Sequence, residues 1–316
     1  MADAPGDYAG FRSGFVCFVG RPNTGKSTLT NAMVGAKIAI TSSRPQTTRH
    51  TIRGIVHRAN FQLILVDTPG LHRPRTLLGQ RLNDLVRDTY SEVDVIALCI
   101  PADEKIGPGD RWIVEQIRQM APKTALLGVV TKIDKVSRDE VAGQLLAVSK
   151  LLGPDSDVVP VSAVRGEQVD VLAEVIASKM PEGPAFYPDG ELTDEPEETL
   201  MAELIREAAL EGVRDELPHS LAVVIEEILP REREDDEQDR DKPVKELLDV
   251  HANLYVERPS QKAIVIGKGG ARLKEVGTNA RKQIESIFGS RIYLHLHVKV
   301  AKDWQRDPKQ LRKLGF

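Results

Sequence analysis

One segment near the start of the chain limits the fold more than any other. The apolar run GFVCFVG at 14–20 leads directly into GRPNTGKS at 20–27, and a helical pattern, STLTNAMVG, follows. A P-loop folds in this setting, because inward-turned backbone N–H groups and the helix N-terminus together surround phosphate. The segment therefore predicts a nucleotide site. The residues expected to line it are Gly20, Arg21, Pro22, Asn23, Thr24, Gly25, Lys26, Ser27 and Thr28.

From residue 14 to about 180, short apolar runs alternate with longer amphipathic stretches. This alternation is typical of βαβ units, which build an α/β fold with a mostly parallel sheet and helices on both faces. We expect a strand in each apolar run: 14–20, 51–57, 61–67, 93–100, 123–130 and 157–162.

Polar motifs follow three of these strands, at the sheet edge where open α/β folds bind ligands. The first is Asp67, Thr68, Pro69 and Gly70; the second is Thr131, Lys132, Ile133 and Asp134; the third is Ser162 and Ala163. A carboxylate in the second motif can accept the N1–H and the 2-amino group of guanine, which adenine does not offer. The motifs therefore predict a P-loop GTPase domain that binds GTP and GDP.

A few residues are expected to bind the phosphates and the metal ion. Lys26 is expected to bridge the outer phosphates, and the hydroxyl of Ser27 to hold Mg²⁺. Asp67 would reach the metal through water, and the N–H of Gly70 would sense the γ-phosphate. In the polar segment at 42–51, Thr48, or with less support Thr47, would complete the metal shell.

The residue after Gly70 is Leu71, where many GTPases carry a glutamine that orients the attacking water. An apolar side chain cannot do this, so we expect slow hydrolysis or a replacement group. Asn23 suggests one, because GTPases with this asparagine and an apolar residue after the glycine resemble potassium-stimulated enzymes. Two interpretations stay open: Asn23 helps to bind K⁺, or it only shapes the loop.

The composition changes sharply after residue 181, where prolines and acidic residues replace the apolar period. We interpret 1–181 as the G domain, 182–198 as a linker and 199–316 as a second domain. In the second domain we expect a helix at 199–214 and a strand at 221–229, then an acidic loop and a further strand. Two helices, at 259–266 and 270–288, and a strand at 292–300 complete it.

This second order of elements, with a GxxG motif between its last two helices, matches the α+β type II KH domain. Its groove would take about four single-stranded nucleotides, over the apolar residues that precede the motif. Residues 258–316 hold 14 basic and 4 acidic residues, as expected of a surface that meets RNA. For Trp304 and Phe316, stacking on RNA bases and packing on the domain both stay open. The expected RNA contacts are Ile266, Gly267, Lys268, Gly269, Gly270, Arg272 and Lys274.

Four segments in this order, GRPNTGKSTLTNAMVG, RPQTTRH, DTPGLH and VIGKGG, together with a C-terminal KH domain, resemble the Era family of bacterial GTPases. The resemblance spans nearly the whole chain. It implies a monomeric cytosolic switch that binds the 3′ end of small-subunit (16S) rRNA and assists maturation of the 30S subunit. It also implies peripheral contact with the inner face of the cell membrane. Thr131 departs from the family, which usually has asparagine there, and we expect guanine specificity to survive.

Other classes of protein are disfavoured to different degrees. A P-loop kinase needs no guanine-reading motif, whereas an RNA-binding protein with a nearly silent G domain and another task is compatible with Leu71. Two cysteines exclude a disulfide framework. The first residues lack the pattern of a signal peptide, and no run reaches the ~20 apolar residues of a membrane span.

Overall fold

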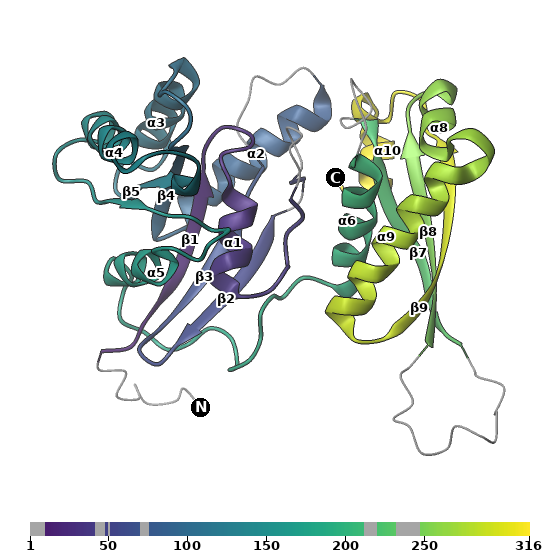
Figure 1. Cartoon of the computed structure of the whole chain (residues 1–316), viewed down its shortest axis with the longest axis horizontal. Coiled ribbons are helices and arrows are strands. Elements are labelled where there is room, and N and C mark those ends of the chain that lie inside the picture. The colour runs from purple at the N-terminus through teal and green to yellow at the C-terminus, as the bar shows by residue number, and fades with distance from the viewer. Residues whose placement is uncertain (1–9, 42–47, 50, 70–75, 212–219, 232–246) are drawn as a thin grey trace. The chain divides into compact units, whose positions relative to one another are not determined.

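The computed structural model describes residues 10–41, 48–49, 51–69, 76–211, 220–231 and 247–316. The chain divides into two compact units (Figure 1). The first comprises residues 1–75 and 79–194, and the second comprises 76–78 and 195–316. Each unit has its own sheet.

The first unit is built on a six-stranded sheet with the order β2-β3-β1-β4-β5-β6. Strand β2 pairs antiparallel with β3, and the other neighbours pair in parallel. Every residue of β3 and β4 is buried, because a parallel strand covered on both faces needs an unbroken apolar run. This confirms the predicted α/β class. The strands are β1 (Arg12–Val19), β2 (Ile52–Arg58), β3 (Phe61–Asp67), β4 (Val95–Pro101), β5 (Ala125–Thr131) and β6 (Val158–Pro160).

Helices cover both faces of this sheet and form two cores. Leu29 of α1 and Leu172 of α5 lie in one core with Cys99. Helices α2, α3 and α4 form the other core, which contains Cys17. Burial raises the pKa of both thiols, that of Cys99 to about 12, so the cysteines pack as small apolar residues. The helices are α1 (Lys26–Val34), α2 (Leu77–Glu92), α3 (Pro108–Met120), α4 (Arg138–Leu152) and α5 (Val169–Ser178).

Much of the segment expected to be a linker lies along strands β2 and β3. The side-chain amide of Gln62 accepts the Phe186 N–H at 2.7 Å and donates to the Tyr187 carbonyl at 2.8 Å. Further along, the Ile55 N–H donates to the Leu192 carbonyl at 2.9 Å. The segment has no apolar period, but its backbone and the strands satisfy each other's hydrogen bonds, which composition does not reveal.

The second unit has the element order expected of a type II KH domain. Strands β7, β8 and β9 form its sheet in that order, with β7 and β8 antiparallel and β8 and β9 parallel. The α+β prediction is confirmed. The elements are α6 (Glu197–Leu210), β7 (Ala222–Pro230), β8 (Leu247–Val256), α8 (Pro259–Ile266), α9 (Ala271–Phe288), β9 (Arg291–Val300) and α10 (Pro308–Lys313).

The two later strands bury one face against helices, but not to the same depth. On β8, the alternate residues Val250, Ala252, Leu254 and Val256 are buried, as predicted. On β9 the prediction holds only in part, because Leu294 and Leu296 are half-buried and Val300 is 41% exposed. Strand β9 is at the sheet edge, so it has a neighbouring strand on one side only.

The C-terminal segment packs back on the second unit, which decides one of the open alternatives. Trp304 is fully buried, and its Nε1–H donates to the Ser220 carbonyl at 2.9 Å. The Phe316 ring stacks on it with a centroid distance of 5.6 Å. Trp304 is therefore not available to stack on RNA bases.

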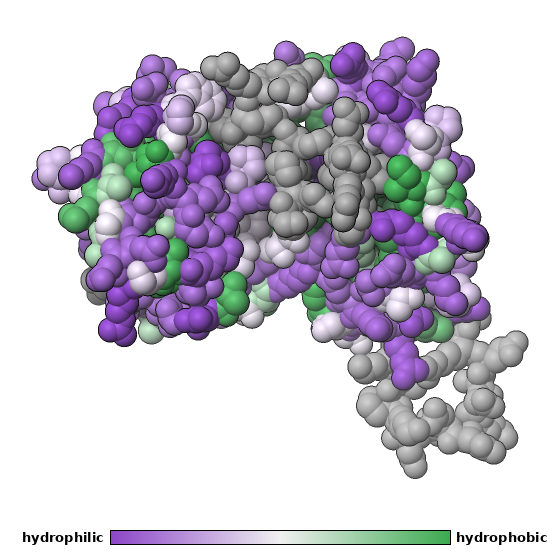
Figure 2. Space-filling view, turned by 45° about the horizontal axis from the view of Figure 1, so that its top comes forward, coloured by the Kyte–Doolittle hydropathy of each residue, from purple (hydrophilic) through white to green (hydrophobic). Residues whose placement is uncertain are grey.

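No helix in the described ranges is both long and apolar enough to span a bilayer. On the face shown in Figure 2, hydrophobic residues form small separate patches among hydrophilic ones.

Candidate nucleotide and RNA sites

The P-loop curls tightly between β1 and α1. Gly25, which precedes the helix, has φ of 93°, a left-handed value that favours glycine. At Gly20, a Cβ atom would lie only 2.6 Å from the Cys99 carbonyl oxygen, so a side chain there would push the loop away from β4. Inside this loop the Lys26 ammonium donates to the carbonyls of Gly20 and Arg21 at 3.1 and 2.9 Å. Burial lowers the pKa of Lys26.

Three oxygen-bearing side chains from separate segments meet beside this lysine. The Ser27 hydroxyl donates to Asp67 Oδ2 at 2.7 Å and lies 3.1 Å from Thr48 Oγ1. The Thr48 hydroxyl also reaches Asp67 Oδ2, at 3.4 Å. The structure thus brings the predicted metal residues together.

The carboxylate of Asp67 suits a divalent cation. It is fully buried, and this burial raises its pKa. Its second oxygen, Oδ1, has no hydrogen-bond partner within the described part of the chain. A buried carboxylate oxygen without a partner is costly, and hard cations such as Mg²⁺ prefer oxygen ligands. Mg²⁺ held by Ser27 and Thr48, with Asp67 reached through water, therefore fits the residues present.

The base-reading motifs lie at the same edge of the sheet, after β5 and β6. Ser162 donates a hydrogen bond to Asp134 Oδ1 at 2.7 Å, and this bond is the main reason that the pKa of Asp134 is lowered. The carboxylate therefore stays ionised at neutral pH and accepts hydrogen bonds. Lys132, directly after β5, has a left-handed φ of 58°. Ala163 directly follows Ser162.

Thr131, where the sequence departs from the family that it resembles, connects the two halves of the site. Its hydroxyl donates to the Thr24 carbonyl of the P-loop at 2.6 Å, and the residue is only 4% exposed. An asparagine side chain is usual at this position. Here a threonine hydroxyl supports the loop, since it reaches the loop carbonyl directly.

Sequence reasoning missed two acidic residues that hold the P-loop. Arg21 donates from Nε to Asp110 Oδ1 at 2.8 Å and from Nη2 to Glu104 Oε2 at 2.9 Å. Asp110 is fully buried and also accepts the Gly107 N–H at 2.8 Å at the start of α3. The GPGD sequence signals a helix start, but nothing in it points to an arginine so far away in the chain.

The other expected nucleotide residues occupy the same loops. Pro22 and Asn23 form the P-loop turn, Thr28 lies in the first turn of α1, and Ile133 begins the 3-10 helix Ile133–Lys135. Thr68 donates to the Phe18 carbonyl at 3.4 Å, and Pro69 follows it. The predictions for Thr47, Gly70 and Leu71 lie outside the described residues.

The GxxG turn joins α8 to α9 in the second unit. Gly267, Gly269 and Gly270 have φ values of 73°, 59° and 78°. A Cβ at Gly267 would lie 2.7 Å from the Arg272 Cβ. Both the left-handed φ and the lack of space therefore require glycine at this position. Lys268 is exposed at the tip of this turn, and Ile266 ends α8.

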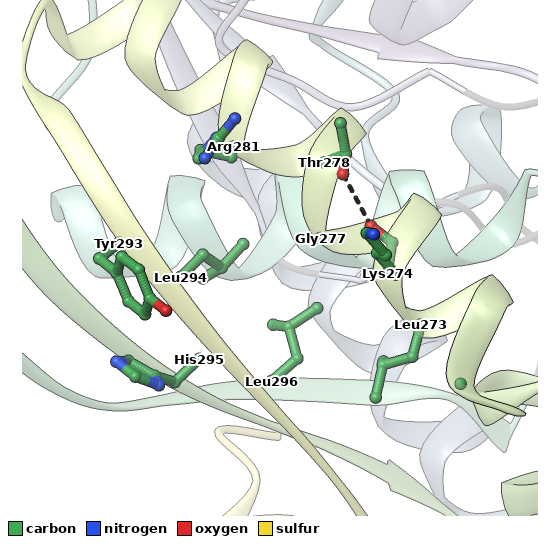
Figure 3. A pocket seen from close by; sticks show the side chains of 10 residues that line it. Leu273, Lys274, Gly277, Thr278, Arg281, Tyr293, Leu294, His295 and Leu296 are labelled. Atoms are coloured by element: carbon green, nitrogen blue, oxygen red, sulfur yellow. Dashed lines mark hydrogen bonds between the residues drawn. The ribbon is translucent and has the colours of Figure 1, made fainter.

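A groove of about 450 Å³ runs between α9 and the edge strand β9 (Figure 3). Leu294 and Leu296 point toward α9, whereas Tyr293 and His295 lie on the other side of the strand. The floor was expected from the residues before GxxG, but α8 buries Val265 in the core and exposes Ile264. Of the predicted RNA contacts, Gly270 and Lys274 line the groove. Its lining is Gly270, Leu273, Lys274, Gly277, Thr278, Arg281, Tyr293, Leu294, His295 and Leu296.

Arg272 has a different task from the predicted phosphate contact. Its Nη2 donates to the carbonyls of Ala209 and Glu211 at 3.2 and 2.6 Å. Carbonyls at a helix C-terminus lack intrahelical partners, and a basic side chain supplies them. The guanidinium therefore holds the end of α6 in place.

Comparisons with known proteins agree with both units. The family described as 50S ribosome-binding GTPase matches residues 15–132, and the KH domain family matches residues 216–305. The chain is 76% identical to GTPase Era of Mycolicibacterium smegmatis over 306 residues, which cover 97% of this chain and 99% of that protein. It is 71% identical to GTPase Era of Mycobacterium tuberculosis over 307 residues, with the same coverage.

Solved structures give the same result in three dimensions. A crystal structure of Era in complex with MgGDPNP and nucleotides 1506–1542 of 16S ribosomal RNA matches with a TM-score of 0.86 and 36% identity. A crystal structure of an Aquifex aeolicus Era variant bound to GDP·AlF₄⁻ matches equally well. Each match covers 96% of this chain and 99% of the other. The structure has a P-loop, the loops of the base-reading motifs and a groove beside the GxxG turn. Together with these features, the sequence identity to Era proteins over nearly the whole length shows that the chain belongs to the Era family of GTPases.

Proposed function

We propose that the first unit hydrolyses GTP and that its nucleotide state controls binding of the 3′ end of small-subunit rRNA by the second unit, to assist maturation of the 30S subunit. The convergence of Ser27, Thr48 and Asp67 beside Lys26 is the observation that carries this proposal. In this proposal, 1–181 is the G domain, 182–198 the connection and 199–316 the KH domain. The RNA bound by the crystallised Era supports the assignment of the partner.

The side chains of the first unit have distinct tasks in this reaction. Lys26 exchanges its two loop carbonyls for phosphate oxygens, and Asp134 accepts the N–H groups of guanine while the N–H of Ala163 bonds O6. Ser27 and Thr48 would hold Mg²⁺, and Asp67 would act on it through water. When bound, Mg²⁺ neutralises charge on the β- and γ-phosphates. Loops 38–50 and 67–80 would differ between the GTP and GDP states.

Guanine recognition is tested by the variant Asp134→Asn. An asparagine amide cannot accept both N–H groups of guanine, so GTP affinity falls, whereas xanthosine triphosphate, which carries a C2 carbonyl, binds better than to the wild type. Equilibrium titration with labelled nucleotides and phosphate release measure both effects. Equal binding of ATP and GTP by the wild type would overturn the proposal, and Lys26→Ala is the control that binds neither.

The RNA part of the proposal is tested separately. Gly269 has a left-handed φ of 59° at the exposed turn, so Gly269→Asp adds strain and a negative charge where phosphate would approach. RNA affinity should fall while basal GTP hydrolysis stays near the wild-type rate. Normal RNA affinity in this variant would contradict the KH site. Phosphate release with and without RNA distinguishes a working switch from an RNA-binding protein with a nearly silent G domain.

We also propose K⁺ as the group that replaces the missing glutamine. Asn23 is exposed in the P-loop with a left-handed φ of 63°, within the loop that is expected to surround the phosphates, and this supports the proposal. Hydrolysis should then be faster in KCl than in NaCl, and Asn23→Ala should remove the difference. Equal rates in the two salts for the wild type would exclude this idea.

The proposal extends to the state of the protein in the cell. We expect a cytosolic monomer with peripheral contact at the inner face of the cell membrane. Sedimentation equilibrium tests the monomer. Flotation with anionic vesicles tests the membrane contact, which is refuted if the protein stays in the soluble fraction.

A further inference from the structure

The last sixteen residues form a fixed part of the second unit. The Ala301 N–H donates to the Val256 carbonyl at 2.8 Å, which continues the pairing of β9 with β8. The fully buried Trp304 and Leu311 then fasten the segment to the unit. At the end, the Phe316 N–H donates to the Leu311 carbonyl at 2.9 Å. The charged side chains of this segment therefore stand on a rigid base.

Five cations project from this base, and we call them the tail cations: Lys302, Arg306, Lys309, Arg312 and Lys313. All five are exposed, and none forms an ion pair with a described acidic side chain. Asp307, the N-cap that precedes α10, accepts the N–H groups of Lys309 and Gln310, and this lowers its pKa.

The order of residues in α10 separates charge from apolar surface. Lys309, Arg312 and Lys313 have the spacing i, i+3 and i+4, so they share one face of the helix. Leu311 and Leu314 point the other way and are buried. The outward face of this segment thus offers cations and almost no apolar surface.

The residues that flank the acidic segment 232–246 lie away from the start of the tail. This segment joins the sheet at Arg231, after β7, and at Leu247, where β8 begins. The tail starts beside Val256, where β8 ends. Strand β8 has ten residues, so the two points are about 30 Å apart.

We propose that the tail cations bind the phosphate backbone of the same RNA whose single-stranded 3′ end occupies the groove between α9 and β9. The inference rests on the proposed RNA-binding function. A KH groove takes about four nucleotides, whereas the RNA crystallised with Era spans nucleotides 1506–1542. The remaining RNA extends beyond the groove, and exposed cations on a rigid base bind phosphates without reading sequence.

The same chemistry argues against a lipid surface as the main partner. A helix that lies in a membrane interface inserts an apolar face among the lipids. Here Trp304, Leu311 and Leu314 are turned inward and held. Only charge is left for a partner, which suits a polyanion in water.

The test uses the full chain and two RNAs. The tail variant combines Lys309→Gln, Arg312→Gln and Lys313→Gln. A control variant removes the same charge from three exposed cations of the first unit, Lys123→Gln, Arg138→Gln and Lys150→Gln. One RNA is a short oligonucleotide of the 3′ end that fills the groove, and the other corresponds to nucleotides 1506–1542. Fluorescence anisotropy at several KCl concentrations gives the Kd values.

The tail variant should bind the short RNA like the wild type but the long RNA about tenfold more weakly. Its slope of log Kd against log salt for the long RNA should be smaller by about 2–3, as expected when three phosphate contacts are lost. The control variant should show neither change. Unchanged thermal unfolding of the tail variant excludes a folding defect as the cause.

Three other results would overturn the proposal. If the tail variant loses affinity equally for both RNAs, the tail cations belong to the groove itself. If the tail and control variants bind both RNAs alike, the tail cations have no role in RNA binding and are only solvated. Loss of binding to phosphatidylglycerol vesicles with unchanged RNA affinity would assign them to a membrane. If the wild type binds neither RNA, the proposed function itself fails, which the short RNA reveals independently of the tail.

Discussion

At the scale of single residues, the hydroxyl of Thr131 is the most informative contact, because one bond joins the base-reading loop to the P-loop. Thr131→Val keeps the shape and removes the donor. The Thr24 carbonyl then lacks a partner, so GDP affinity should fall by about 5- to 10-fold, the equivalent of about 1 kcal/mol for a hydrogen bond. Titration of fluorescent GDP measures it. Thr131→Ser retains the donor and should bind like the wild type; if the two variants bind alike, the bond has no role.

A second prediction concerns the unpartnered oxygen of Asp67. If this carboxylate serves Mg²⁺, GDP and GTP should bind much more tightly with Mg²⁺ than with EDTA, and Asp67→Asn should lose most of that ratio. Burial raises the pKa of Asp67, so the Mg²⁺ effect is full above the raised pKa and fades as the pH falls through it. Asp94→Asn is the control, because Asp94 accepts the Phe15 N–H in the same unit. A preserved Mg²⁺ ratio in Asp67→Asn would refute the assignment.

The limits of sequence reasoning are clear at this scale. Lys26, Ser27 and Asp134 could be named because each stands within a short motif whose chemistry is local. The contacts of Arg21 with Asp110 and of Arg272 with Ala209 span 89 and 63 residues. Such partners depend on which loops the fold brings together, and no local pattern encodes that. The roles of the motif residues stay predictions until the variants above are measured.

At the scale of elements, two basic residues in the first turn of α9 have different roles. Arg272 closes α6, whereas Lys274 is exposed and lines the groove. Arg272→Met should lower the free energy of unfolding of the second unit by about 1–3 kcal/mol, since charged hydrogen bonds to two carbonyls are lost. Urea denaturation measures it.

The matched change, Lys274→Met, should have the opposite profile. It leaves the stability within about 0.5 kcal/mol, as usual for surface substitutions, and weakens binding of the short RNA. If Arg272→Met instead weakens RNA binding with unchanged stability, the guanidinium contacts phosphate as the sequence alone suggested.

The element order could be predicted from the sequence for both units, because the apolar period changes from strand to helix between clear breaks. Alternation also identified the buried face of β8. The same alternation overestimated how deeply β9 is buried. This strand is at the edge of the sheet, and its Leu294 and Leu296 line a groove instead of a closed core. The alternation also gave no sign that residues 186–194 form hydrogen bonds with β2 and β3, because such bonds do not depend on an apolar period.

At the scale of the whole molecule, the two units have separate cores and should respond to separate ligands. Saturation with GDP and Mg²⁺ at about 100 times Kd should stabilise the first unit by about 2.7 kcal/mol and leave the second nearly unchanged. Short RNA should do the reverse. Calorimetry should therefore resolve two transitions, each shifted by one ligand. A single transition shifted by both ligands would show that the units unfold as one.

The placement of charge along β8 has a consequence for how the second unit meets its partner. Residues 232–246 hold 8 acidic and 4 basic residues, whereas residues 258–316 hold 14 basic and 4 acidic ones. The tail cations are fixed beyond Val256, at one end of that strand, so positive charge is concentrated on one side of the described unit. The electric field of a polyanion turns the unit before contact, so that the cations face the polyanion when the two molecules meet. Most other orientations are then disfavoured before contact. Recognition thus begins with alignment, before any nucleotide enters the groove.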